Sequence, residues 1–251
     1  MSKDTITVYW APAAFNQDQE SWNMLYREPV SVKTDLQEST TKGAGIRSCP
    51  AMKNTTNNLF SLKSAIDEKF EINLDLAKPI LESDILQAPL PLSKEAKLGL
   101  RKNRNTEYLD HYHYAYNLSW LMLADAPVEI QMSSPYMPPF SPLKGSFIPA
   151  GQFNVGKWYR ELTLEFITPK ESNVFEIKEG QDLAYLKFLT DSKIVFKRYL
   201  LTDSLRSMAK EFEQSPNRYG AFQSLKSRYQ MASKSKIQQA VLSEIKKNVI
   251  E

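Results

Sequence analysis

Apolar and polar residues alternate with a period of two along much of the chain up to residue 200, the pattern of strands that bury one face. The clearest alternation covers 157–168, where Trp158, Leu162, Leu164 and Phe166 share one face. Many of these runs are rich in β-branched and aromatic residues, so each is predicted to form a strand. The other predicted strands are 4–10, 26–32, 57–63, 69–76, 107–124, 128–132, 174–178, 183–189 and 193–200.

The spacing of these strands predicts the fold class. They follow one another about every ten residues without helical crossovers, which favours antiparallel sheets. We expect an α+β, mainly β protein with an antiparallel β-sandwich or barrel-like core, most of it formed by 106–200. Two local pairings are expected: 57–63 with 69–76, and 174–178 with 183–188 through a tight turn at Glu179-Gly180.

The period changes near Leu201, where apolar residues begin to recur every three or four positions. We therefore divide the chain into a β-rich domain, 1–200, with irregular excursions at 34–48 and 77–106, and a basic amphipathic helical tail, 201–251. Short helices need a surface to pack on. That surface is either the protein's own sheet or another subunit, and we expect the last apolar stripe of the tail to pack on a partner chain; it consists of Ile237, Val241, Ile245 and Val249.

Composition and charge narrow the classes of function. Among 251 residues, 42% are hydrophobic and 24% are charged, as in ordinary globular proteins. The 32 basic and 29 acidic residues leave a net charge of +3, which favours a protein partner or self-assembly over nucleic acid. The single cysteine excludes an intrachain disulfide, and no signal segment or membrane-spanning apolar stretch is visible. A cytosol, or a particle assembled in one, is the expected setting.

The two histidines, His111 and His113, are the only candidate metal ligands of note. Residues i and i+2 of a strand share a face, so the two rings would be neighbours. An oxygenase-type iron site also needs a carboxylate, which an adjacent strand could supply from Glu129, Glu161 or Glu165. A pair of histidines is a weak motif, so we expect no cofactor and keep an iron, manganese or zinc enzyme as the alternative.

Four tyrosines follow the other face of the same predicted strand: Tyr108, Tyr112, Tyr114 and Tyr116. Tyrosine is favoured at interfaces because its ring is apolar and its hydroxyl polar, so this face could bind a partner. A cross-strand aromatic cluster that covers a sheet explains the pattern as well. No phosphate-binding loop, dinucleotide fingerprint or nucleophile elbow occurs in the sequence, so no catalytic residue is predicted.

Residues 46–188 carry a series of features in a fixed order. They are Cys49-Pro50 and the Asn-containing turn from Asn54 to Phe60, the apolar strand 118–123, a Pro-Pro loop before Pro142-Leu143 and Gly145, Trp158 with Phe166, and Lys178-Glu179-Gly180 before an apolar strand. This order resembles a family of proteins from marine tailed phages and bacteria whose shared domain has no assigned function. The resemblance implies a phage origin and no particular activity.

Together these observations lead to one expected function and one alternative. We expect a phage-encoded, non-enzymatic protein that acts by binding or assembly, as a virion-associated structural or accessory protein or as a binder of a host factor. Its expected location is the host cytoplasm or the virion. The alternative is a metal-dependent, oxygenase-like enzyme that uses His111 and His113.

Overall fold

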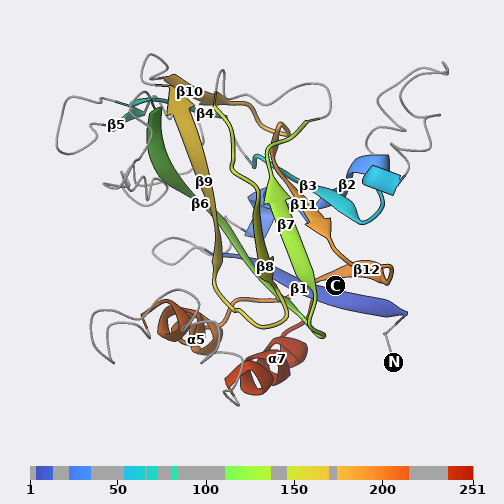
Figure 1. Ribbon diagram of the computed structural model, residues 1–251. Coiled ribbons are helices and arrows are strands. Elements are labelled where there is room, and N and C mark those ends of the chain that lie inside the picture. The colour runs from blue at the N-terminus through green and yellow to red at the C-terminus, as the bar shows by residue number, and fades with distance from the viewer. Residues whose placement is uncertain are drawn as a thin grey trace.

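A computed structural model describes residues 4–13, 23–34, 54–65, 67–72, 81–83, 111–136, 146–169, 174–214 and 237–250. Within these residues the chain forms twelve strands and two long helices (Figure 1). The strands are β1 (Thr5–Pro12), β2 (Val30–Ser31), β3 (Leu59–Lys63), β4 (Glu68–Ile72), β5 (Leu81–Ser83), β6 (His111–Ala124), β7 (Glu129–Ser133), β8 (Gly151–Asn154), β9 (Glu161–Pro169), β10 (Val174–Ile177), β11 (Asp182–Phe188) and β12 (Lys193–Arg198). The helices are α5 (Asp203–Gln214) and α7 (Ile237–Lys247).

The strands form three sheets. A four-stranded sheet has the order β12-β1-β6-β9, and a five-stranded sheet has the order β2-β3-β11-β7-β8. A three-stranded sheet, β10-β4-β5, lies at the end of the molecule opposite the helices (Figure 1). All pairs are antiparallel except β1 with β12, which lie almost 190 residues apart in the chain and so need no local crossover.

The main hydrophobic core lies between the four-stranded and the five-stranded sheets, so the fold is a β-sandwich. The four-stranded sheet contributes Val8, Trp10 and Met122, and the five-stranded sheet contributes Ile130 and Leu186. All five side chains are at most 2% exposed. The predicted α+β, mainly β fold is confirmed, and seven of the twelve strands come from the predicted region 106–200.

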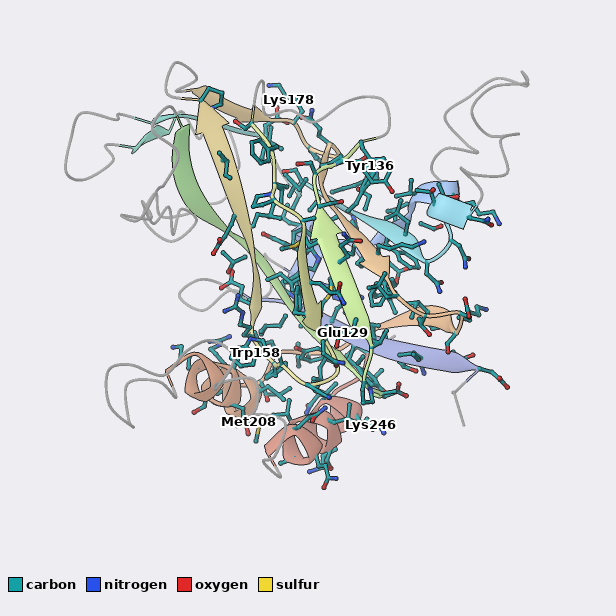
Figure 2. The ribbon with its side chains drawn as sticks, in the orientation of Figure 1. Glu129, Tyr136, Trp158, Lys178, Met208 and Lys246 are labelled. Carbon is teal, nitrogen blue, oxygen red and sulfur yellow. The ribbon has the colours of Figure 1, made fainter. Side chains whose placement is uncertain are left out.

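Helices α5 and α7 cover the other face of the four-stranded sheet. Leu205 of α5 and Val241 and Ile245 of α7 are fully buried, in one cluster with Tyr9 and Leu121 of the sheet. In Figure 2, Met208 and Lys246 mark this helical end of the molecule, and Tyr136 and Lys178 mark the opposite end. Neither helix is long and apolar enough to cross a membrane.

The prediction that the last stripe packs on a partner chain is wrong for Val241 and Ile245. Both are buried against the chain's own sheet, because that sheet presents a second apolar face that needs a cover. Val249 also has an intrachain partner, since it forms an antiparallel bridge with Tyr199 at the edge of β12. The side chain of Ile237 lies outside the described part of the chain.

The two predicted local pairings are also wrong, although the strands themselves exist. β3 pairs with β11 and β4 pairs with β10, so neither β3–β4 nor β10–β11 is a hairpin. Each pair of consecutive strands is instead one extended path that bends between two sheets. The ladder continues across the bend, because the Gln181 carbonyl accepts from Ser64 N–H at 2.8 Å and the Ser64 carbonyl accepts from Gly180 N–H at 2.9 Å.

Two short strands were not predicted. β5 lies within the expected irregular excursion 77–106, and β8 consists of four residues that are exposed or half-buried. Neither is long enough to display an alternation of its own. The other excursion, 34–48, lies outside the described residues except for 34, as do 215–236 of the tail.

Candidate functional site

The backbone register of β6 and β9 defines the surroundings of the two histidine positions. Pro169 lies opposite His111 and Ile167 lies opposite His113. Glu165 lies opposite Ala115, roughly 10 Å along the strand from the midpoint of the two histidines. Because facing residues share a face, the Glu165 position lies on the same side of the sheet as the two histidine positions, diagonally from His113.

The two other candidate carboxylates lie still farther away. Glu161 lies opposite Leu121, near the other end of β6, and Glu129 belongs to the five-stranded sheet. The pairing therefore places Glu129 and Glu161 away from His111 and His113, and a site completed by Glu165 stays a prediction. The side chains of the histidines themselves lie outside the described part of the chain.

The tyrosine positions alternate with the histidines along β6. Tyr116 lies opposite Leu164, which is 3% exposed and belongs to the core between the sheets. The positions of Tyr112 and Tyr114 share the face of the Tyr116 position, and the two histidine positions fall on the other face. Tyr108 lies outside the described residues. The proposed partner surface of tyrosines stays a prediction.

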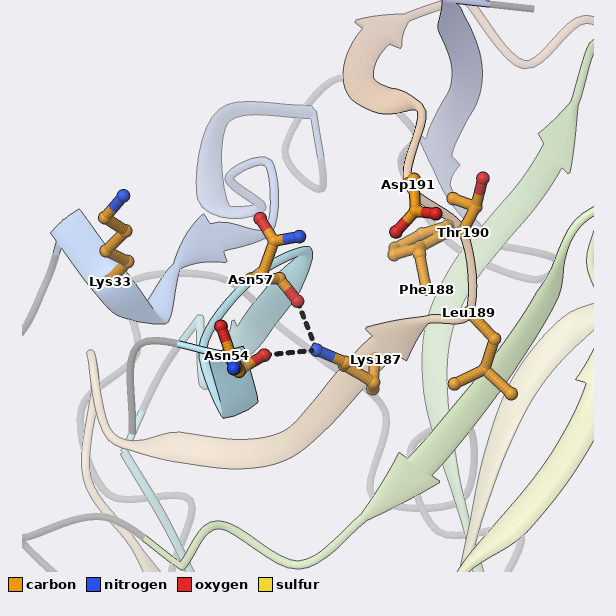
Figure 3. A pocket seen from close by; sticks show the side chains of 8 residues that line it. All are labelled: Lys33, Asn54, Asn57, Lys187, Phe188, Leu189, Thr190 and Asp191. Atoms are coloured by element: carbon orange, nitrogen blue, oxygen red, sulfur yellow. Dashed lines mark hydrogen bonds between the residues drawn. The ribbon is translucent and has the colours of Figure 1, made fainter. Parts of the chain in front are cut away.

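A hollow of about 510 Å³ opens where β11 ends, far from β6 in sequence (Figure 3). One wall is the turn 54–58 before β3, and the other is the loop 188–192 between β11 and β12. We call it the Lys187 hollow. It is lined by Lys33, Asn54, Asn57, Lys187, Phe188, Leu189, Thr190 and Asp191.

Asn58 ties the two walls of the Lys187 hollow together. Its side-chain amide donates to the carbonyls of Thr190 at 2.7 Å and Ser192 at 3.0 Å, and its own carbonyl accepts from Phe188 N–H at 2.9 Å. Its backbone is left-handed, with a φ of 49°, a conformation that asparagine tolerates better than most residues. The walls are thus held at a fixed separation by three hydrogen bonds.

The Lys187 side chain forms the second tie. Its ammonium donates to the carbonyl oxygens of Asn54 at 3.3 Å and Thr55 at 3.0 Å, and also to that of Asn57. Burial lowers the pKa of Lys187, which by itself would favour a neutral, reactive amine. An ammonium has three protons, however, and all three are donated here. The Lys187 side chain therefore has a structural role, because it links the end of β11 to the turn 54–58.

The remaining lining groups form a polar rim. The side chains of Lys33, Asn54, Asn57 and Asp191 are exposed. Figure 3 shows the Asp191 carboxylate on the side of the loop that faces Asn57, and Lys33 at the outer edge. Phe188 also lines the hollow and is only 1% exposed, so its ring offers a ligand almost no surface.

A second polar cluster lies on the outer face of the five-stranded sheet, around Asp182. Its carboxylate accepts from the Ser61 hydroxyl at 2.6 Å, the Lys63 ammonium at 3.0 Å and the Tyr185 hydroxyl at 3.3 Å. Serine, lysine and a carboxylate could suggest a nucleophile with its base. Here Ser61 is fully buried and its proton is directed at the carboxylate, so the cluster joins β3 to β11 beside a register shift.

The sequence matches no family model, no curated protein and no solved structure. The likeness to a phage and bacterial family thus depends only on the residues named for it above. Sequence reasoning did not find the Lys187 hollow. The one local signal for it was the pair Asn57-Asn58, since asparagine is favoured where a turn needs a positive φ.

Proposed function

We propose that this chain acts by binding another molecule and not by catalysis. In this proposal it is a virion-associated structural or accessory protein of a tailed phage, or a binder of a host factor. It works in the host cytoplasm or on the virion, with a protein, a second copy or a host molecule as its partner.

The observation that supports the proposal is the hydrogen bonding of the Lys187 ammonium. A catalytic lysine needs a lone pair or a proton that it can exchange with a substrate. The Lys187 ammonium donates all its protons to backbone carbonyls of Asn54, Thr55 and Asn57 and thereby fixes one wall of the hollow. A surface held in a fixed shape needs little ordering when a ligand binds, which favours affinity.

The phage setting comes from the resemblance of 46–188, and its test is mass spectrometry of purified particles of a phage that encodes this chain. Recovery of the chain in a fixed ratio to the major capsid protein supports a virion role. If the chain is instead found only in the lysate, the virion part of the proposal fails, and the host-factor part is examined in infected cells.

The non-enzymatic part is tested by elemental analysis of the purified chain. We expect no stoichiometric transition metal. Iron, manganese or zinc bound one to one, and lost when both His111 and His113 are replaced by alanine, would contradict the proposal and favour the oxygenase-like alternative.

A further inference from the structure

We propose that the Lys187 hollow binds an uncharged saccharide unit. This inference depends on the proposed binding function and names its ligand class. It is drawn from the chemistry of the rim, the charge of the hollow and the small apolar surface of the lining.

The rim groups match hydroxyl groups that both donate and accept. The Asp191 carboxylate accepts only, and the amides of Asn54 and Asn57 both donate and accept. Planar carboxylate and amide groups can each engage two neighbouring hydroxyls of a sugar ring. Thr190 also lines the hollow, with its hydroxyl oxygen accepting from Ser192 N–H at 3.1 Å, which leaves its proton to donate.

The charge of the Lys187 hollow favours an uncharged ligand. Three groups in it are ionised: Lys33, Lys187 and Asp191. The charge of Lys187 faces three carbonyl dipoles, which offset it, and Lys33 stands at the outer edge (Figure 3). The interior thus offers a ligand one carboxylate acceptor, and the cation that is not held by carbonyls, Lys33, lies at the outer edge.

The small apolar surface of the lining disfavours a peptide as the ligand. Protein partners usually gain their affinity by inserting an aromatic or aliphatic anchor into a desolvated pocket. Phe188 is only 1% exposed, and Leu189, at 45% exposed, is the one large apolar side chain that the lining offers to a ligand. The exposed part of Leu189 suits contact with the C–H face of a sugar ring better than it suits the insertion of an anchor side chain.

The test is a titration of the isotope-labelled full chain, followed by NMR, with a panel of neutral monosaccharides and their methyl glycosides. We expect at least one sugar to shift the amide signals of 54–58 and 188–192, with a Kd on the order of 1 mM. Asp191→Ala and Asn57→Ala should each weaken binding about tenfold, the loss of one strong hydrogen bond. Asp203→Ala, an exposed carboxylate on α5, is the matched control and should bind as the unmodified chain does.

Two outcomes would overturn the saccharide inference. Each of them can be told apart from a failure of the proposed binding function. If no sugar shifts these signals, the saccharide assignment is wrong. If the full chain self-associates by light scattering and Asp191→Ala makes it monomeric, the hollow is an interface between copies. The binding function would then hold while the saccharide assignment fails. The rim side chains are exposed, so neither variant should alter folding, which thermal unfolding checks.

Discussion

At the scale of single residues, Gly156 lies where two turns of the backbone meet closely. A Cβ atom at this position would lie 2.2 Å from the carbonyl oxygen of Ala126 and 2.9 Å from the Cα atom of Pro127. Both neighbours are backbone atoms, so no side-chain rotation can relieve the contact. Gly156→Ala should therefore lower the free energy of unfolding by about 3 kcal/mol in a denaturant titration.

Gly151, only five residues away, is the matched control. A Cβ atom there meets nothing within 4 Å, so Gly151→Ala should change the free energy of unfolding by less than about 1 kcal/mol. Equal losses for the two variants would mean that the close approach at Gly156 is absent.

Tyr159 and Tyr199 form a buried pair whose hydroxyl oxygens are 2.9 Å apart. Burial raises the pKa of both phenols above the ordinary value of 10.0. Above about pH 10 the unfolded chain ionises these groups while the folded chain keeps its protons. The free energy of unfolding should therefore fall with rising pH, by up to about 1.4 kcal/mol per pH unit for each tyrosine.

The test is urea unfolding at a series of pH values from about 8 to about 11. The double variant Tyr159→Phe with Tyr199→Phe should show a flatter decline than the unmodified chain, because it lacks both raised phenols. An identical decline in the two proteins would show that other groups cause the alkaline sensitivity.

At the scale of elements, the bend between the sheets explains why the predicted hairpin was wrong. Gly180 has a positive φ of 76°, and Gln181 N–H donates to the Lys178 carbonyl at 3.0 Å, so the turn itself was predicted correctly. A turn residue determines the local path of the chain but not the partner of each strand. β10 and β11 instead take their partners from β4 and β3, more than 100 residues earlier.

Helix α7 likewise shows that the local sequence predicts an element but not the surface on which it packs. Its periodicity predicted a helix with an apolar stripe, and the helix is present. The pattern could not specify what the stripe packs against, because a sheet face and a partner chain are equally apolar. The deciding feature is the second apolar face of β1 and β6, with Tyr9 and Leu121 both buried beneath the helices.

Ile245→Ala should therefore act on stability and not on assembly. Ile245 is fully buried, so truncation should lower the free energy of unfolding by about 2–5 kcal/mol. Gln239→Ala, on the exposed side of α7, should cost less than about 0.5 kcal/mol. Light scattering should give the same mass for both variants and the unmodified chain. A loss of mass in Ile245→Ala at unchanged stability would restore the partner-chain interpretation.

At the scale of the whole molecule, the fold class followed from the sequence but the site did not. Alternation along 157–168 and similar runs reflects burial of one face, which each strand displays locally. The Lys187 hollow is assembled by contacts such as Asn58 with Thr190, which are 132 residues apart, and no local pattern encodes them. The residues that lie opposite His111 and His113 are likewise set by the pairing of β6 with β9 and by no local pattern.

The central claim is that Lys187 shapes a binding surface and does not catalyse. Competitive amine labelling tests this claim most directly. The folded chain is treated with a trace of an acylating reagent near neutral pH, and peptide mass spectrometry compares Lys187 with Lys33 on the same hollow. We expect Lys187 to react at least about tenfold more slowly, because its three protons are held by backbone carbonyls. Faster labelling of Lys187 than of Lys33 would reveal a free nucleophilic amine and contradict the account.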